Sequence, residues 1–234
     1  MSLYVLLMGV QGSGKGTQAA FIRDTYKIPH VSTGDLFRAM RTREDDLARK
    51  IQQIMAEGRL VSDEDTNAVL QDRLEQPDAQ KGVIFDGYPR NPAQAAWLDQ
   101  YLTGRGAKLN AVLSMELDLY IAFKRAFGRV TDASGEAHNI YFNADDITWK
   151  FEDHPENRYP PRLEATHKTS GELLKRRPDD ASAHAVLKRI DTYVAETQPV
   201  LDHYDKTGIL HTIEADQSID AVWGKIQAII ERVK

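Results

Sequence analysis

The feature that most constrains the fold of this chain is a glycine-rich stretch close to its N-terminus, residues 9–17 (GVQGSGKGT). An apolar run at residues 3–8 precedes it and predicts a buried strand, and residues 18–23 after it predict the start of a helix. Glycines allow tight turns that aim backbone N–H groups at an anion, and a helix N-terminus favours negative charge. Strand, glycine loop and helix in this order predict a phosphate-binding loop.

Two side chains of the loop suit nucleotide phosphates. Lys15 supplies a positive charge for the outer phosphates, and Thr17 offers a hydroxyl to a magnesium ion. The usual pattern places Ser or Thr directly after the lysine, whereas Gly16 intervenes here. A glycine-rich turn with a lone lysine is often only a turn, but the strand and the helix around this one favour phosphate binding.

The composition of the 234-residue chain is that of a globular protein, with 41% apolar and 28% charged residues. Its length allows one large domain with insertions. A net charge of −5, with no dominant basic stripe, argues against a nucleic-acid polymer as partner. The chain has no cysteine, which excludes disulfides and cysteine-ligated zinc and fits a reducing compartment.

Neither a signal peptide nor a membrane span is expected. The apolar run at residues 3–8 has no basic flank before it, and no stretch approaches the ~20 apolar residues that a span requires. We therefore expect a cytoplasmic protein with no membrane partner, and we expect it to be a monomer.

Apolar runs that predict strands alternate with stretches of helical spacing. The predicted strands are residues 3–8, 30–31, 83–85, 111–115 and 209–213. Helices are predicted at residues 18–26, 63–74, 93–102, 119–127, 186–201 and 219–233. Between the first two of these, Ser32 is expected to cap a helix, and apolar positions at Leu47, Ile51, Ile54 and Met55 predict a helix that ends at Gly58. This alternation predicts an α/β fold with a parallel sheet and helices on both faces.

Residues 128–180 break this pattern, because turn residues dominate and apolar runs are few. A segment of that length is too long for an ordinary loop, so it predicts a small inserted domain or a lid. Ligands of parallel sheets bind beyond the C-terminal ends of the strands, where both the glycine loop and Asp86 are expected.

Several motifs, taken in order, resemble the adenylate kinase family over nearly the whole chain. They are residues 9–18, 32–38 (STGDLFR), 58–61 (GRLV), 86–90 (DGYPR) with Gln94, 128–129 (GR) and 177–180 (RPDD). The resemblance implies a P-loop NTPase-like core of residues 1–31, 62–127 and 181–234, an AMP-binding insertion at 32–61 and a lid at 128–180. It implies reversible phosphoryl transfer from Mg-ATP to AMP that gives two ADP, with ATP, AMP and ADP as partners and Mg²⁺ as cofactor.

The same resemblance assigns roles to individual residues. The ATP-binding set is Gly12, Ser13, Gly14, Lys15, Gly16, Thr17, Arg125, Arg129, Ala137, His138 and Gln217. The AMP-binding set is Thr33, Arg38, Arg59, Leu60, Val61, Gly87, Tyr88, Pro89, Arg90, Gln94, Arg177 and Arg189. The catalytic charges are Lys15, Arg90, Arg129, Arg177 and Arg189, and Thr17 and Asp86 are the Mg²⁺ residues, mostly through water.

Phosphoryl transfer explains why so many cations recur, because it needs positioning and charge stabilisation rather than covalent work from the protein. The fork of an arginine suits bidentate contact with phosphate. Any one of these arginines, taken alone, could equally be a solvated surface charge. Arg177 and Arg189 stand one residue further apart than in most members of the family, so Lys188 competes with Arg189 for the contact with AMP.

Two other functions remain open at this point. One is another nucleoside monophosphate kinase, but short-lid relatives that act on UMP or CMP lack an insertion of this length, and the Gln94 amide suits the adenine edge. The other is a nucleotide-binding regulator that has lost turnover. The cations argue against it, since a pure binder has no need of them on both sides of the transferred group; they are Lys15, Arg38, Arg90 and Arg129.

Some positions depart from the family, and the lid is the main one. Gln11 stands where proline is usual, Asn91 replaces a common threonine, and residues 149–161 form an extra stretch with no assigned role. Many long-lid members hold a structural zinc at positions that carry Thr131, Ser134, His167 and Ser170 here. Because hydroxyls are poor zinc ligands, we expect no zinc but a hydrogen-bonded quartet.

Two further expectations concern the same segments. Aromatic packing is expected to stabilise the lid, through Tyr141, Phe142, Trp149, Phe151 and Tyr159. Residues 32–61 and 128–180 are expected to close over the nucleotides, because water has to be kept from the transferred phosphoryl group.

Overall fold

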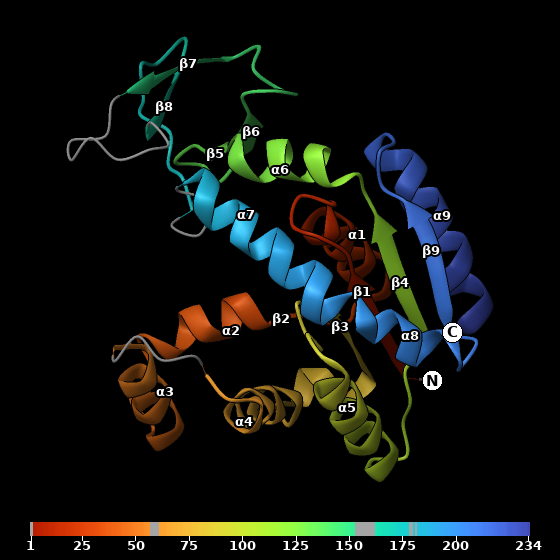
Figure 1. Ribbon diagram of the computed structural model, residues 1–234. Coiled ribbons are helices and arrows are strands. Elements are labelled where there is room, and N and C mark those ends of the chain that lie inside the picture. The colour runs from red at the N-terminus through yellow and green to blue at the C-terminus, as the bar shows by residue number, and fades with distance from the viewer. Residues whose placement is uncertain (1, 57–60, 153–161, 178–179, 181) are drawn as a thin grey trace. The chain divides into compact units, whose positions relative to one another are not determined.

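The computed structural model describes residues 2–56, 61–152, 162–177, 180 and 182–234. The chain forms two compact units (Figure 1). The first comprises Met1–Gly9, Gly14–Glu116 and Ala195–Lys234, and the second comprises Val10–Ser13 and Leu117–Val194. The predicted division into a core, an AMP-binding insertion and a lid follows different boundaries and stays a prediction.

A five-stranded sheet forms the centre of the first unit. Its strands are β1 (Leu3–Met8), β2 (His30–Ser32), β3 (Gly82–Asp86), β4 (Ala111–Glu116) and β9 (Leu210–Glu214), in the order β2-β3-β1-β4-β9. Every neighbouring pair is parallel, which confirms the predicted parallel sheet. All carboxyl ends therefore lie at one edge, where β1 leads into the glycine loop and β3 ends at Asp86.

Helices follow the strands of this unit as the sequence predicts. They are α1 (Lys15–Tyr26), α2 (Thr33–Met40), α3 (Asp46–Ala56), α4 (Asp63–Leu74), α5 (Pro92–Gly104), α8 (Pro199–Asp205) and α9 (Ile219–Val233), with a short 3₁₀ helix, η1 (Pro77–Lys81). The side chains of Ser62, Asn91 and Ser218 accept a backbone N–H from the first turns of α4, α5 and α9. Such N-caps satisfy amide groups that the helix itself leaves without partners.

The helices cover both faces of the sheet. Successive residues of a strand point to opposite faces, and Tyr4, Leu6 and Met8 of β1 join a buried cluster with side chains of α4, α5 and α8. Helices α1 and α9 pack together elsewhere in the unit and contact β1, β3 and β4 (Figure 1). Phe21 and Trp223 join these two helices with ring centroids 5.5 Å apart.

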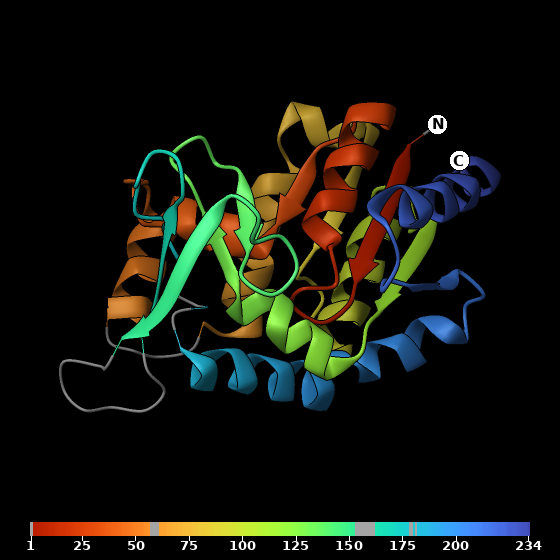
Figure 2. The ribbon, with the colours of Figure 1, turned by 90° about the horizontal axis from the view of Figure 1, so that it is seen from above.

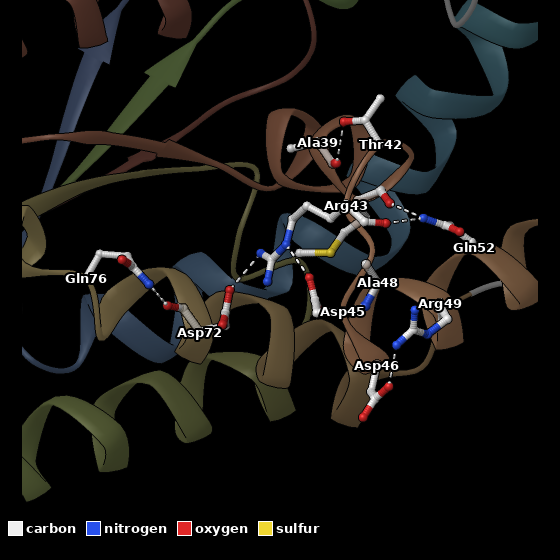
Figure 3. A network of polar contacts seen from close by, with 11 residues as sticks. Ala39, Thr42, Arg43, Asp45, Asp46, Ala48, Arg49, Gln52, Asp72 and Gln76 are labelled. Carbon is white, nitrogen blue, oxygen red and sulfur yellow. Dashed lines mark hydrogen bonds and ion pairs between the residues drawn. The ribbon is translucent and has the colours of Figure 1, made fainter.

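A polar network holds the connection between α2 and α3 onto α4 (Figure 3). Arg43 donates from Nε to Asp45 and from Nη1 to Asp72, both over 2.8 Å, and Gln52 Nε2 donates to the carbonyl oxygens of Met40 and Arg43. Below this network the apolar side chains of Met40, Ala48, Ile51 and Val69 form a small core. The predicted end of α3 at Gly58, and the predicted AMP ligands Arg59 and Leu60, lie outside the described residues.

Within the part of the chain that the structure describes, the second unit contains two α-helices and two small antiparallel sheets (Figure 2). The helices are α6 (Leu119–Phe127) and α7 (Ala183–Thr192); the strand pairs are β5 (Arg129–Thr131) with β6 (Ala137–Asn139) and β7 (Ile147–Glu152) with β8 (Arg162–His167). Bridges of Thr131 to Lys175 and of Thr166 to Leu173 extend the two sheets. The segment predicted from turn residues therefore contains regular hairpins.

The core of these hairpins is aliphatic rather than aromatic. Its buried side chains are those of Val130, Ile140, Ile147, Leu163, Ala165 and Leu174. Tyr141, Phe142, Trp149 and Phe151 are exposed, so the prediction that they supply the packing is wrong. Trp149 and Phe151 lie in β7, where Ile147 is the buried residue, and Tyr159 lies outside the described residues.

The predicted long helix over residues 186–201 is interrupted. The chain leaves α7 through a π-helical segment, Tyr193–Thr197, before α8 begins at Pro199. Proline has no N–H to donate to the preceding turn, so the regular ladder cannot continue through it. A π-helical turn shifts the helical register, and the buried positions pass from Val186 and Ile190 to Val200 and Tyr204.

Candidate functional site

The backbone of the glycine loop depends on glycine at Gly12. Its φ of 88° lies in the left-handed region, and a Cβ there would come within 2.8 Å of the Ala122 carbonyl oxygen. Ser13 follows with its hydroxyl buried and without a hydrogen-bond partner among the described residues. A buried hydroxyl without a partner favours a polar ligand at this point, because leaving it unpaired costs free energy.

Lys15 stands at the start of α1, where the loop ends. Its Nζ donates to the carbonyl oxygen of Gly9 over 2.6 Å, so the side chain folds back along the loop. Gly14 caps the helix with a φ of 92°, and Gly16 and Thr17 lie exposed in the first turn. The loop thus presents a cation and a hydroxyl at a helix N-terminus, the arrangement that binds phosphate.

Asp86, at the end of β3, belongs to the same charge cluster. His30 Nε2 lies 3.2 Å from its carboxylate. Burial acts to raise the pKa of Asp86, but the hydrogen bond from His30 and the positive charges of Lys15 and Arg90 outweigh it and hold the pKa below its usual value. The carboxylate is therefore ionised at neutral pH, as a ligand of magnesium-bound water has to be.

Gln11, at the position where proline is usual, ties the loop to α7. Its Nε2 donates to the carbonyl oxygen of Arg189 over 3.1 Å. Proline has no such donor, so this contact is a consequence of the substitution noted in the sequence. The sequence alone assigned no partner to Gln11.

A second group of predicted residues gathers where β2 and β3 end. Thr33 Oγ1 donates to the carbonyl oxygen of Gly87 over 2.8 Å, and Arg90 Nε donates to the same oxygen over 2.8 Å. Gly87 has a φ of 73°, and a Cβ there would lie 3.0 Å from Thr33 Oγ1. These contacts bring Thr33, Gly87 and Arg90 together, as the predicted AMP site requires.

Other members of the predicted AMP set lie around this group. Arg38 is exposed on α2 and pairs with Asp35, one turn before it. Tyr88 is buried and reaches Asn67 and the carbonyl oxygen of Gln94 with its hydroxyl; burial, and the charge of Asp63, raise its pKa far above the ordinary value. Val61 is partly buried against α2 and α3.

Gln94 is 4% exposed, and its side-chain amide is held at both ends. The backbone N–H of Arg90 donates to Oε1 over 2.8 Å, and Nε2 donates to Asp63 over 2.6 Å. Asn91 Nδ2 donates to both oxygens of the same carboxylate, at 3.1 and 3.0 Å. The sequence predicted Gln94 but gave no role to Asp63, which stands 31 residues away in the chain.

In the second unit, one buried carboxylate gathers two of the predicted arginines. The side chain of Asp180 is fully buried and accepts from Arg129 Nε over 3.0 Å, from Arg129 Nη2, and from Arg189 Nη1 over 2.7 Å. Arg189, rather than the exposed Lys188, therefore shares this partner with Arg129. Arg177 precedes Asp180, whose backbone N–H donates to the Arg177 carbonyl oxygen over 3.0 Å.

Two more arginines contact aromatic rings. Arg125, one of the predicted ATP residues, lies over the ring of Phe142 at 5.7 Å. Arg176, which the sequence did not single out, lies over Phe127 at 4.8 Å and donates to its carbonyl oxygen; burial lowers the pKa of this guanidinium. Arg176 thus links residue 127 of α6 to the segment that leads to Asp180.

The remaining predicted ATP residues belong to different units, Ala137 and His138 to the second and Gln217 to the first. Ala137 is exposed and His138 buried in β6, and His138 Nε2 lies 3.9 Å from a carboxylate oxygen of Asp132 without a hydrogen bond among the described residues. Gln217 precedes α9 and donates to the carbonyl oxygen of Glu214 over 3.3 Å.

The predicted quartet of Thr131, Ser134, His167 and Ser170 is wrong. Ser134 Oγ donates to Asp132, His167 Nδ1 accepts from the Thr169 amide, and Ser170 Oγ accepts from the Glu172 amide. Within the described residues no hydrogen bond joins two members of the quartet. Ser134, His167 and Ser170 bond within their own turns instead, because short polar side chains reach nearby groups first, and Thr131 lies in β5, where its backbone pairs with Lys175.

One cluster of the second unit has metal-ligand chemistry. Ligand atoms of Asp132, Glu136 and His138 lie within 4.8 Å of one another. The set has one imidazole and two carboxylates, fewer nitrogen and sulfur donors than a structural zinc site usually has. The absence of zinc therefore stays a prediction.

The fold and these residues define a class of protein. A parallel sheet, a glycine loop between β1 and α1, and a lysine at the end of that loop are the features of a P-loop nucleotide-binding transferase. Among the described residues, no helix has the length and apolarity to cross a bilayer.

Comparison with known proteins identifies the family within this class. The sequence model of the family described as adenylate kinase matches residues 7–209. Adenylate kinases of Clostridioides difficile and Streptomyces avermitilis are each 38% identical over 228 residues, covering 97% of both chains. That of Caldanaerobacter subterraneus subsp. tengcongensis is 38% identical over 224 residues, covering 95% of this chain and 94% of its own. The chain belongs to the adenylate kinase family, whose activity is phosphoryl transfer between ATP and AMP.

Proposed function

We propose that the chain transfers a phosphoryl group reversibly from Mg-ATP to AMP, with the residues of the two groups above as donor and acceptor sites. One observation carries this proposal. In the first unit, Lys15 begins α1 directly after the loop that follows β1, while Thr33 follows β2, and Gly87, Arg90 and Gln94 follow β3, the strand that pairs with both β1 and β2. Two ligand groups at one edge of one sheet suit a reaction between two nucleotides.

On the donor side, backbone N–H groups of the glycine loop and Lys15 hold the ATP phosphates. Thr17 and the ionised Asp86 hold Mg²⁺, mostly through water, and the ion supplies charge neutralisation at the transferred group. Arg129 and, on the AMP side, Arg189 contribute further positive charge, and Asp180 keeps their guanidinium groups together before a nucleotide arrives.

On the acceptor side, Arg38 and Arg90 hold the AMP phosphate and Gln94 reads the base. Arg90 Nε is fixed by the Gly87 carbonyl oxygen, so part of its fork is held in place before binding. The acceptor is AMP rather than UMP or CMP, because a buried amide pairs with the adenine edge and is left unpaired by other bases. The protein acts as a monomer in the cytoplasm, with ATP, AMP and ADP as its partners.

A coupled assay of ADP formation tests the acceptor site. Arg90→Leu is expected to lower kcat/KM for AMP by about 10²–10³-fold, the usual cost of one preorganised charge. Arg49→Leu is the matched control, since Arg49 is exposed on α3 and pairs only with Asp46 among the described residues. Equal activity of the two variants would contradict the role of Arg90, and comparable kcat/KM values of the wild type for CMP and AMP would contradict the choice of acceptor.

Metal analysis of the purified protein tests the lid. We propose that it holds no structural zinc, because the chain has no cysteine, and three of the four positions of the family's site, Ser134, His167 and Ser170, bond within their own turns. One tightly held zinc per chain would overturn this, and Asp132→Asn, Glu136→Gln and His138→Gln would then locate it.

A further inference from the structure

The amide of Gln94 has only one orientation compatible with its neighbours. A carboxylate only accepts hydrogen bonds and a backbone N–H only donates them. Asp63 therefore has to accept a hydrogen bond from Gln94 Nε2, which it does over 2.6 Å. The N–H of Arg90 has to donate to Gln94 Oε1, which it does over 2.8 Å. The chemistry of the two partners decides which end of the amide is nitrogen and which is oxygen.

Asp63 is in turn held by Asn91. The Asn91 side chain accepts the backbone N–H of Gln94 with Oδ1 over 2.9 Å and donates from Nδ2 to both oxygens of Asp63. One residue thus caps α5 and fixes the carboxylate at the start of α4, and the two helices pack side by side (Figure 1). The threonine common at this position can cap a helix, but its single hydroxyl cannot do both.

The fixed amide leaves one N–H and one lone pair for a ligand. Adenine presents an amino donor beside a ring-nitrogen acceptor, and an amide pairs with both at once. A purine with an oxo group at the same carbon presents an acceptor beside a ring N–H, which is the opposite order. At a base position set by the rest of the site, the orientation of the amide decides between the two.

We propose that Asp63 is a positioning residue for base selection, which with Asn91 orients the Gln94 amide so that AMP is accepted and inosine monophosphate (IMP) is rejected. This inference rests on the proposed contact of Gln94 with the acceptor base. Asp63 does not touch the nucleotide; it acts through Gln94.

The test is the ratio of kcat/KM for AMP to kcat/KM for IMP. Asp63→Leu removes the acceptor of Nε2 and keeps a side chain of similar shape, so only the N–H of Arg90 still orients the amide, and the ratio is expected to fall at least tenfold. Asp63→Asn keeps an oxygen acceptor and is expected to retain most of the preference. Asn91→Thr keeps the helix cap but loses the hydrogen bonds to Asp63. Its AMP-to-IMP ratio of kcat/KM is expected to lie between those of the wild type and Asp63→Leu.

The matched control is Glu64→Leu. Glu64 is the next residue in the first turn of α4 and is exposed, so its loss removes the same charge from the same helix end without touching Gln94. Its ratio is expected to equal that of the wild type. An unchanged ratio in Asp63→Leu, or an equal loss of activity with AMP and IMP, would overturn the inference and leave only a structural role.

Failure of the inference is distinguishable from failure of the proposed function. If the wild type does not prefer AMP to IMP, the proposed role of Gln94 fails; if it does and Asp63→Leu keeps the preference, only the role of Asp63 fails. Should Asp63→Leu not fold, Asp63→Ala takes its place. NMR resonances of the Gln94 side-chain amide test the contact directly. The Nε2 proton that is hydrogen-bonded to Asp63 is expected to resonate downfield in the wild type and to move upfield in Asp63→Ala. An unchanged chemical shift of this proton would refute the contact.

Discussion

Replacing Asp180 by asparagine is expected to destabilise the protein through the two arginines that share it. The carboxylate is fully buried, while the side chains of Arg129 and Arg189 are 24% and 33% exposed. Breaking a buried ion pair by removing one partner costs about 3–5 kcal/mol. Because both arginines reach water, the lower end applies, and we expect a loss of about 3 kcal/mol in the free energy of unfolding.

Calorimetry at pH 7 measures this loss. For a chain of this size, about 3 kcal/mol corresponds to a decrease in Tm of roughly 10 °C. Inorganic tripolyphosphate is expected to raise the Tm of Asp180→Asn more than that of the wild type, because arginines without their carboxylate bind an anion more tightly and the ligand stabilises the state it binds. In an Arg189→Gln background the cost of Asp180→Asn is expected to be smaller, since only Arg129 then loses its partner.

Asp191→Asn is the control, because Asp191 is an exposed carboxylate on the same helix as Arg189. Its Tm is expected to stay within about 1–2 °C of the wild type, as for most surface substitutions. A Tm of Asp180→Asn equal to that of the control would refute the stabilising role of the carboxylate. A lower Tm that tripolyphosphate does not restore would refute the proposal that these arginines bind phosphate.

Three further predictions concern the rest of the site. Lys15→Met is expected to lower turnover by about 10²–10³-fold without loss of fold, measured by ADP formation and circular dichroism; a folded variant with normal turnover would contradict the role of Lys15. The pKa of Asp86 is lower in the folded than in the unfolded protein, so the unfolded state binds more protons as the pH falls, and the stabilisation, complete above about pH 4, is lost below it. Asp86→Asn should therefore flatten the fall of unfolding free energy between about pH 4 and pH 2 in urea titrations, and an unchanged slope would speak against it. A bisubstrate analogue should slow hydrogen exchange in residues 32–61 and 128–180, and unchanged exchange in both would count against closure.

The sequence predicted the elements whose signals are local. The helix over residues 119–127 has its observed ends because Asp118 caps it and Gly128 follows it. The glycine loop and Asp86 were predicted for the same reason, since both follow strand ends, whereas Arg90 was assigned through the resemblance to the family. Family, fold class and activity are confirmed by the comparisons, whereas the residue roles stay predictions.

What the sequence missed depends on contacts between distant residues or on weak patterns. Asp63 and Gln94 meet only after α4 and α5 pack, and no spacing in the chain marks the pair. Strand β7 has a single buried residue, Ile147, so it lacks the alternation that identifies a strand. The quartet failed because hydroxyl groups are satisfied by nearby turns, which an alignment of positions does not reveal.

The packing of α9 on α1 has a consequence for synthesis of the chain. The helix that presents the glycine loop is supported by α9, through Phe21 with Trp223 and through Gln18 Nε2, which donates over 3.0 Å to the carbonyl oxygen of Ile219, 201 residues later in the chain. Strand β9, which pairs with β4, also comes near the end of the chain. A nascent chain on the ribosome therefore carries a complete glycine loop long before it can bury the helix behind it, so folding of this unit waits for the synthesis of α9.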